Sequence, residues 1–427
     1  MLFERPDSGE GCFLLHVGMK RPCYADEIQE FQALAVSAGA EIVGEIRARR
    51  DRPHPGLFVG QGKAEEIADQ VKEVCAEVVL VNHPLSATQE RNLEKMLGVR
   101  VLDRNGLILD IFAQRAATHE GKIQVELAQL EHLSTRLVRG WTHLERQKGG
   151  IGLRGPGETQ LESDRRLIGL RIKHLKGRLE RVEKQRELGR RERRRGRVPT
   201  VALVGYTNAG KTSLFNALTG AEVAARNTLF ATLDPTIRRL SPGELDEVLL
   251  VDTVGFVRDL PHELVVAFRA TLTETREADL LVHVIDASDP HNDDRKRQVE
   301  LVLDTVGAGK IPCIHVYNKL DKVKTLSLEP VNGSRAPKLQ VSAVTGEGVE
   351  ALARAIRVRA VGEAVCGSLE LGPGDSKLRA KLFDLRAVKG EQSHDSGGWT
   401  LEVSLTSKRW KELCIQEGLS DDSFQRV

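Results

Sequence analysis

The pattern of apolar and polar positions over the first 118 residues alternates between two periods. Short apolar runs, such as residues 13–17 and 78–82, predict buried strands, and the amphipathic run 25–38 predicts a helix. This rhythm is typical of a small parallel sheet with helical crossovers. The sequence therefore predicts an N-terminal α/β domain over residues 1–118. Its other predicted strands are 40–46 and 100–102, and its other predicted helices are 86–97 and 106–116.

From residue 119 the apolar spacing changes to alternating steps of three and four. One such stripe runs from Ile123 to Leu144 and a second from Leu161 to Val182. Matching stripes on two helices joined by one loop predict an antiparallel coiled-coil hairpin over residues 119–197. The joining loop, residues 147–160, holds five glycines and the cations Lys148 and Arg154. This composition favours a mobile tip that approaches a partner's backbone over a plain flexible loop.

A phosphate-binding loop is predicted after the apolar run 201–204. The run ends in Gly205-Tyr206-Thr207-Asn208-Ala209-Gly210-Lys211-Thr212 and a helical pattern follows. Strand, glycine loop and helix form the context in which backbone N–H groups and the helix N-terminus face phosphate oxygens. We expect Lys211 to reach the β- and γ-phosphates and Thr212 to offer a hydroxyl to Mg²⁺.

Two further segments complete the predicted phosphate end of the site. The run 248–251 leads into Asp252-Thr253-Val254-Gly255, in which Asp252 can hold Mg²⁺ through water and the Gly255 amide can sense the γ-phosphate. Between this motif and the phosphate loop lies Phe230-Ala231-Thr232-Leu233-Asp234. Its Thr232 is the predicted second hydroxyl ligand of Mg²⁺.

The base is expected to be guanine. Asn318-Lys319-Leu320-Asp321 follows the strand-like run 314–317, and the Asp321 carboxylate can accept from guanine N1–H and N2–H₂. Lys319 can lay its methylene stem along the base or sugar. The last motif, Ser342-Ala343-Val344, offers a backbone N–H to guanine O6. Four motifs in this order, each at the end of a predicted strand, predict a P-loop GTPase domain over residues 198–362, with a mostly parallel sheet and helices on both faces.

The catalytic assignment is less complete. Many GTPases carry a glutamine after the Asp-x-x-Gly glycine to orient the attacking water, and this chain has Phe256 instead. The predicted catalytic residues are Lys211, Thr232, Gly255 and Asn208. Asn208 either helps to bind K⁺ beside the phosphates or only orders the loop. An arginine supplied by a partner is the other route, and basal hydrolysis is expected to be slow.

Charge and cysteine usage narrow the class of partner. The chain carries a net charge of +2, yet residues 161–197 hold fifteen Lys and Arg against six Asp and Glu. A local excess of this size beside a basic tip favours contact with a nucleic-acid backbone. The six cysteines have no metal-binding spacing and predict reduced, mostly buried thiols. We find no secretion signal and no membrane-spanning run, so a cytoplasmic protein without a membrane anchor is expected, a monomer when free.

The remaining segments contain few residues with a predicted chemical role. Residues 366–376 are interpreted as a linker, 378–387 and 400–405 as strands and 407–417 as a helix, which gives a small α+β appendage within residues 363–427. Near the N-terminus, Gly60-Gln61-Gly62-Lys63 is either a second nucleotide site or a plain strand-to-helix turn. The first option would make the chain an RNA-remodelling ATPase, and a nucleotide-stabilised assembly scaffold is a further alternative.

The whole chain resembles the HflX family of ribosome-associated GTPases. The resemblance rests on residues 205–212, 230–236 and 252–256, and outside the GTPase domain on residues 106–112 and 149–162. It implies GTP and GDP binding with Mg²⁺ held by Thr212 and Thr232, and hydrolysis that the ribosome stimulates. It also implies association with the large ribosomal subunit and its rRNA, with the hairpin tip reaching the peptidyl-transferase centre. Such proteins split stalled or idle ribosomes under stress.

Overall fold

The structure, a computed structural model, divides into two compact units. The first comprises Met1–Gly189, Arg226–Asp234 and Val254–Leu272. The second comprises Arg190–Ala225, Pro235–Thr253 and Thr273–Val427. The residues that the structure describes are 11–140, 156–195, 198–223, 229–240, 248–258, 269–323, 338–362, 364–385, 387–394, 397–417 and 424–426.

The N-terminal domain is a four-stranded parallel sheet in the order β2-β1-β3-β4, as its alternating pattern predicts. The fully buried run within β1 and the four buried residues of β3 form its centre. Side chains at the helix starts fix two of the boundaries, because Ser86 and Asp103 accept hydrogen bonds from backbone N–H groups three residues on. The elements are β1 (Gly11–Met19), α1 (Ala25–Ser37), β2 (Glu41–Arg50), α2 (Gln61–Glu73), β3 (Val78–Val81), α3 (Ala87–Leu97), β4 (Arg100–Asp103) and α4 (Arg104–Arg115).

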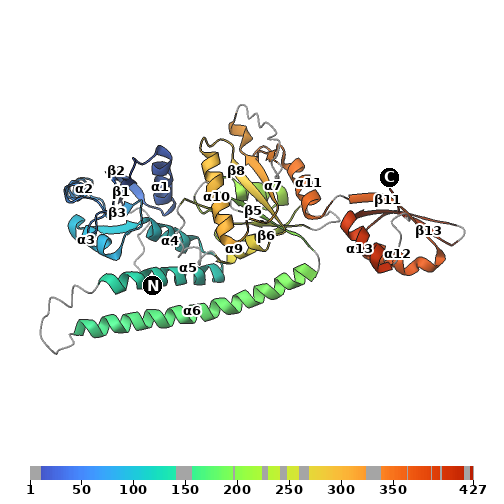
Figure 1. Ribbon diagram of the computed structural model, residues 1–427, viewed down its shortest axis with the longest axis horizontal. Helices are drawn as coiled ribbons and strands as arrows, with labels where there is room; N and C mark the ends of the chain where they lie inside the picture. The colour runs from blue at the N-terminus through green and yellow to red at the C-terminus, as the bar shows by residue number, and fades with distance from the viewer. Residues whose placement is uncertain are drawn as a thin grey trace. The chain divides into compact units, whose positions relative to one another are not determined.

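Two long helices, α5 (His119–Gly140) and α6 (Pro156–Arg195), lie side by side in opposite directions (Figure 1). His119 meets Arg178 and Glu126 meets Arg171, which sets the antiparallel register. The predicted stripes form one shared core, made of Ile123, Leu127, Leu130, Ile168, Leu175 and Leu179. Trp141, Leu144 and residues 147–155 of the predicted tip lie outside the described residues.

The second unit contains a six-stranded sheet in the order β10-β9-β8-β5-β7-β6, parallel except for β6. Alternate residues of β8 pack with α7 and α11 in one core, and His283, on the opposite face, approaches Glu300 of α10. Helices therefore cover both faces, as predicted. The elements are β5 (Thr200–Gly205), α7 (Lys211–Thr219), β6 (Thr236–Arg239), β7 (Leu249–Asp252), α9 (Arg269–Arg276), β8 (Leu280–Asp286), α10 (Asn292–Val306), β9 (Cys313–Asn318), η1 (Leu320–Lys322), β10 (Lys338–Gln340) and α11 (Val349–Ala360).

The C-terminal sheet is antiparallel in the order β12-β13-β11-β14, and it corrects two predictions. The predicted linker 366–376 overlaps the inner strand β11 (Ala364–Leu371), and the predicted strand 378–387 overlaps the helix α12 (Ser376–Asp384). Leu378 and Leu382 are one helical turn apart and both face the core, so the helical period was the right one. The other elements are η2 (Pro373–Asp375), β12 (Val388–Ser393), β13 (Trp399–Thr406), α13 (Ser407–Glu417) and β14 (Phe424–Arg426).

All six cysteines lie among the described residues, and all are thiols rather than disulfides. The expectation that most are buried is wrong, because only Cys12 is buried while Cys75 and Cys366 are exposed. Within the described part of the chain, no helix combines the length and the apolar character needed to cross a membrane.

The hairpin core yields a stability prediction. Leu175 is fully buried between α5 and α6, so Leu175→Ala should destabilise the hairpin by about 2–5 kcal/mol through lost burial and the cavity left behind. Hydrogen exchange of the amides of α5 and α6 measures this loss. Leu167 on the same helix is 58% exposed, and Leu167→Ala should change exchange little. Equal effects of the two variants would contradict the shared core.

Candidate guanine-nucleotide site

The phosphate loop begins where β5 turns into α7. Gly205 has φ +152°, and a Cβ there would lie 2.3 Å from the carbonyl oxygen of Val284 on the neighbouring strand β8. Gly210, the N-cap of α7, has φ +88°. Both positions require glycine, since a side chain would be strained or would collide with backbone. The two glycines that the sequence predicts therefore shape this loop.

Lys211 lies inside the loop that it closes. Its side chain is buried, and its Nζ donates to the carbonyl oxygens of Gly205 at 3.1 Å and Tyr206 at 2.9 Å. Burial lowers the pKa of the ammonium to about 8, while the nearby Asp252 carboxylate opposes that shift. The two carbonyl groups hold the ammonium at the turn of the loop. An ammonium at this position can contact a phosphate oxygen.

Thr212 and Asp252 bring two hard oxygen ligands together. The Thr212 hydroxyl, in the first turn of α7, donates to Oδ2 of Asp252, at the end of β7, at 2.8 Å. Both residues are buried, and Thr253 hydrogen-bonds the carbonyl oxygen of Leu203 on β5. Hydroxyl and carboxylate oxygens are the ligands that Mg²⁺ prefers, so this pair fits the ion.

The Asn318 side chain joins two of the predicted motifs. Its Nδ2 donates to the carbonyl oxygen of Ala209 at 3.0 Å, and its Oδ1 accepts from the Ala343 N–H at 3.1 Å. Asn318 is buried, and a Cβ on Gly210 would lie 2.3 Å from its Nδ2. The amide therefore connects the phosphate loop to the 342–344 loop. The sequence did not predict this structural role.

The predicted base-recognition residues also meet. Ser342 Oγ donates to Oδ1 of Asp321 at 2.6 Å, which orients the carboxylate. Lys319 has φ +68°, and its Nζ donates to Oδ2 of Asp286 at 2.6 Å. Asp286, at the end of β8, was missed by sequence reasoning, although its position after an apolar run was a usable signal. Val344 is exposed at the rim of this group.

The remaining loop residues differ in environment. Asn208 is exposed, with φ +61°. Tyr206 and Thr207 are buried, and the guanidinium of Arg295 lies over the Tyr206 ring at 5.0 Å from its centroid. The exposed amide of Asn208 is thus the polar side chain of the loop that faces solvent.

The 229–234 segment, which includes the predicted ligand Thr232, belongs to the first unit. Phe230 has φ +57° and packs edge-on against Phe112 of α4, with ring centroids 4.7 Å apart. The Leu229 N–H donates to the hydroxyl of Ser37 at 3.1 Å. Leu233 is buried, and Ala231 and Thr232 are half-buried. The N-terminal domain therefore holds one end of this segment by packing.

Asp234 caps the hairpin helix α5. Its Oδ2 accepts from the N–H groups of Ala117 at 3.0 Å and Thr118 at 2.8 Å, and its Oδ1 accepts from the Thr118 hydroxyl at 2.6 Å. The same hydroxyl accepts from the N–H of Gly121. A carboxylate at a helix N-terminus satisfies backbone donors that the helix leaves unpaired. Asp234 is thus positioned for capping, and sequence reasoning missed this role.

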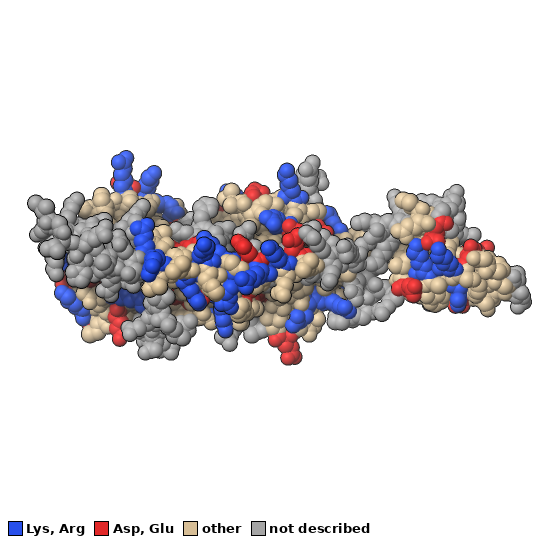
Figure 2. Space-filling model, turned by 90° about the horizontal axis from the view of Figure 1, so that it is seen from below, with Lys and Arg blue, Asp and Glu red and all other residues tan. Residues whose placement is uncertain are grey.

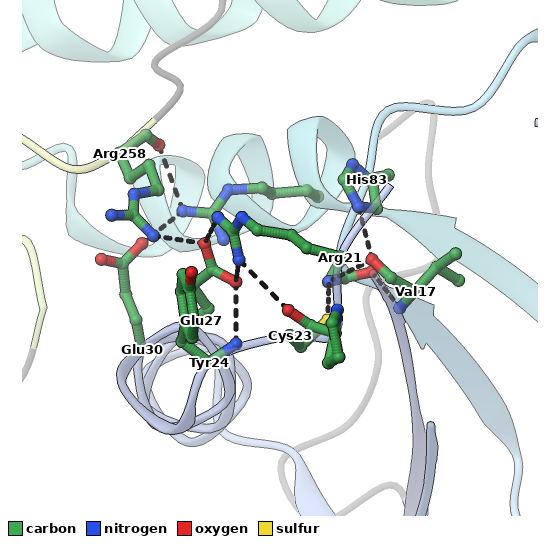
Figure 3. Close-up of polar contacts among 11 residues, drawn as sticks. Val17, Arg21, Cys23, Tyr24, Glu27, Glu30, His83 and Arg258 are labelled. Carbon is green, nitrogen blue, oxygen red and sulfur yellow. Dashed lines mark hydrogen bonds and ion pairs between the residues drawn. The ribbon is translucent and has the colours of Figure 1, made fainter. Parts of the chain in front are cut away.

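The 254–258 segment also belongs to the first unit. Val254, Gly255 and Phe256 are buried. Arg258 pairs with Glu27 at 2.5 Å, and its carbonyl oxygen accepts from Arg104 at 3.1 Å (Figure 3). Although burial raises the pKa of the Glu27 carboxyl, hydrogen bonds, chiefly from Arg21, outweigh it and lower the pKa. Glu27 therefore remains ionised opposite Arg258.

The Gly60–Lys63 sequence is the start of helix α2 (Gln61–Glu73). Gly60 is the N-cap of α2, and the ammonium of Lys63 contacts both carboxylate oxygens of Glu66 at 2.9 Å. This lysine belongs to an ordinary helical ion pair, so the described geometry gives no support to a second phosphate site.

Comparison with known proteins matches four family models along the chain. They are described as GTP-binding GTPase N-terminal (residues 25–113), GTP-binding GTPase Middle Region (115–193), 50S ribosome-binding GTPase (200–319) and HflX C-terminal domain (330–423).

Two curated relatives and one solved structure illustrate the likeness. GTPase HflX of Escherichia coli (strain K12) is 52% identical over 418 residues, covering 97% of this chain and 98% of the relative. GTPase HflX of Caldanaerobacter subterraneus subsp. tengcongensis is 48% identical, with 89% and 88% covered. A GTP-binding protein from Sulfolobus solfataricus in complex with GDP is 24% identical with a TM-score of 0.45, covering 82% of this chain and 98% of that one.

The base-recognition geometry yields a specificity prediction. Asp321→Asn keeps an acceptor for Ser342 but turns one oxygen into an amide donor, which should weaken GDP binding at least about 10²-fold. The same amide donates to the C2 carbonyl of xanthine, so affinity for xanthosine diphosphate should rise. Calorimetric titration with both nucleotides measures the exchange. Asp294→Asn, an exposed change on α10, is the control, and unchanged GDP affinity in Asp321→Asn would exclude this carboxylate from base recognition.

Proposed function

Because the chain belongs to the HflX family of GTPases, we propose that GTP hydrolysis at the motifs above controls its association with the large ribosomal subunit. The observation that carries the proposal is the capping of α5 by Asp234, two residues beyond Thr232. It links a nucleotide-sensing segment to the basic hairpin. The description of the family model for residues 200–319 as a 50S ribosome-binding GTPase supports the partner.

The nucleotide is assigned to the edge of the six-stranded sheet where the parallel strands end. Lys211 and the N–H groups of the phosphate loop contact the phosphates, and the 318–321 and 342–344 motifs contact guanine. Thr212 and Thr232 are the proposed Mg²⁺ ligands, with Asp252 behind them. Mg²⁺, when bound, neutralises charge on the β- and γ-phosphates. The pair of Thr212 and Asp252 oxygens, 2.8 Å apart and buried, supports this assignment.

Hydrolysis is proposed to need help from outside the loop. Phe256 is 2% exposed and its side chain carries no polar atom, so that side chain cannot orient an attacking water. The exposed amide of Asn208 is the candidate for a K⁺ ligand beside the phosphates, and a cation from the ribosome is the other source of charge. Lys211, Thr232 and Gly255 complete the proposed catalytic set, as contacts to the γ-phosphate.

The hairpin is the proposed rRNA-binding element. Arg165, Arg166, Lys173, Arg181 and Lys184 of α6 are exposed, and Figure 2 shows Lys and Arg side chains gathered along this helix. Arg171 and Lys176 pair instead with glutamates of α5. The exposed cations supply the phosphate contacts, and the glycine-rich tip supplies close approach. Splitting of stalled or idle ribosomes in the cytoplasm under stress is the activity that this arrangement would serve.

The contacts of Asp234 suggest how nucleotide state reaches the hairpin. Contact of Thr232 with Mg²⁺ and the γ-phosphate would move the chain two residues on, and with it the Asp234 carboxylate that binds Ala117 and Thr118. Arg258, three residues after Gly255, likewise holds the 254–258 segment to the N-terminal domain through its ion pair with Glu27. In this proposal the GTP state favours ribosome engagement and hydrolysis releases the protein.

The direct test measures GTP hydrolysis with and without purified large ribosomal subunits, in K⁺ and in Na⁺. We expect stimulation of at least about tenfold by subunits, and loss of that stimulation when residues 149–157 are shortened. Subunit binding should be tighter with a non-hydrolysable GTP analogue than with GDP. Fast hydrolysis that is indifferent to subunits, or equal binding of the two nucleotide forms, would contradict the proposal.

The coupling through α5 has its own test. Thr118→Val keeps the shape of the side chain but removes the hydroxyl that bonds Asp234 and Gly121, a loss of about 1 kcal/mol at a helix cap. Subunit-stimulated hydrolysis should fall about fivefold while basal hydrolysis is unchanged. Thr135→Val is the matched control, because the Thr135 hydroxyl bonds the carbonyl oxygen of His132 within α5. An equal effect of both variants would exclude the cap as the link.

A further inference from the structure

Two histidines lie side by side on neighbouring strands of the six-stranded sheet. His283 of β8 is directly opposite His315 of β9 in the parallel register, and their rings meet edge to face with centroids 5.6 Å apart. His283 is 1% exposed. Among the described residues, neither ring has a hydrogen-bond partner at Nδ1. Buried polar atoms are nearly always satisfied, so an unpartnered pair calls for a ligand.

Glu300 of α10 adds a carboxylate to this pair. One ligand atom from each of His283, Glu300 and His315 lies within 4.8 Å of the other two. Glu300 Oε1 is 3.9 Å from Nε2 of His315, and the Glu300 side chain is 46% exposed. Bonds of about 2.0–2.1 Å to a tetrahedral ion place ligand atoms roughly 3.3 Å apart, so binding would draw the three ligand atoms together by rotation of the glutamate side chain and of the imidazole rings.

We propose that His283, Glu300 and His315 form a binding site for a transition-metal dication of the Zn²⁺ class. Two imidazoles and one carboxylate are the ligand set of three-coordinate protein zinc sites that keep a fourth position for water. Imidazole nitrogen favours Zn²⁺, Co²⁺, Ni²⁺ and Cu²⁺ over Mg²⁺, which prefers oxygen. This site is therefore chemically distinct from the Thr212–Asp252 pair.

The protonation state suits metal binding. Burial lowers the pKa of His283 to about 3 and that of His315 to about 4, with nearby lysines adding to both shifts. Both rings are therefore neutral near pH 7, as metal ligands must be. Lys211 and Lys338 also act on these rings, and the cation that competes for Glu300 is Lys296, whose Nζ lies 3.9 Å from Oε1 of Glu300. Its flexible, partly exposed side chain can turn to solvent when a metal enters.

An ion at this site would join β8, β9 and α10. His283 lies three residues before Asp286, and His315 lies three residues before Asn318. Asp286 pairs with Lys319, and Asn318 ties the phosphate loop to the 342–344 loop. The metal would therefore hold together the two strands that carry the base-recognition residues, which stabilises the nucleotide domain independently of any ribosomal role.

Cobalt titration tests the site in the full-length protein with GDP and Mg²⁺ present in excess. Tetrahedral Co²⁺ absorbs intensely in the visible range, whereas Co²⁺ among six oxygens absorbs weakly, so the Mg²⁺ site is distinguished. We expect the intense spectrum, its loss on adding Zn²⁺, and a rise of about 5 °C in the unfolding temperature at a hundredfold excess of Zn²⁺ over its dissociation constant.

Variants of the proposed ligands, with controls on α10, test which side chains bind the metal. Glu300→Gln and His315→Leu should weaken Co²⁺ binding at least tenfold, whereas Asp294→Asn and His291→Leu on the same helix and its cap should not. Lys296→Met should strengthen binding, because it removes the competing cation, a gain that general loss of folding cannot mimic. Absence of the spectrum, its survival in His315→Leu, or a thiolate charge-transfer band from cysteine would overturn the proposal.

Discussion

The buried amide of Asn318 is the interaction on which the candidate nucleotide site depends. It donates to the phosphate loop at Ala209 and accepts from the 342–344 loop at Ala343, two segments more than one hundred residues apart. An apolar side chain there would leave the buried Ala209 carbonyl unsatisfied, at about 1–3 kcal/mol, and would remove the partner of the half-buried Ala343 N–H. Gly210 has no side chain because a Cβ would occupy the space of this amide. Gly210 in the phosphate loop and Asn318 at the end of β9 therefore depend on each other for their packing.

A second constraint comes from how the chain is shared between its two units. The 229–234 segment precedes β6 and the 254–258 segment follows β7, but both are packed in the first unit, the former at the start of α5 and the latter against the N-terminal domain. Each segment is held by a charged contact, Asp234 at the start of α5 and Arg258 at Glu27. A movement of either segment must break or carry those contacts. On the proposal above, these few bonds are what would couple the nucleotide state to the hairpin.

Much of this architecture was predictable from sequence because its signals are local. Glycine spacing revealed the phosphate loop, and the apolar period revealed the parallel sheets and the hairpin stripe through Leu127 and Leu175. The cap by Asp234 and the Arg104–Arg258 contact were not predictable, since polar contacts across more than one hundred residues leave no periodicity. The C-terminal helix α12 was predicted as a strand because its nine residues offer only about two and a half turns of pattern.

The burial of Phe256 decides what kind of GTPase this chain can be. A side chain that is 2% exposed and apolar contributes packing, so the position beside Gly255 is committed to structure rather than to orienting water. The nearby Arg258 also has a structural role, because its guanidinium pairs with Glu27 and its carbonyl oxygen accepts a hydrogen bond from Arg104. On the proposal above, a cation at the loop or a partner supplies the charge needed at the γ-phosphate. Dependence on a partner would then make hydrolysis a timer for association.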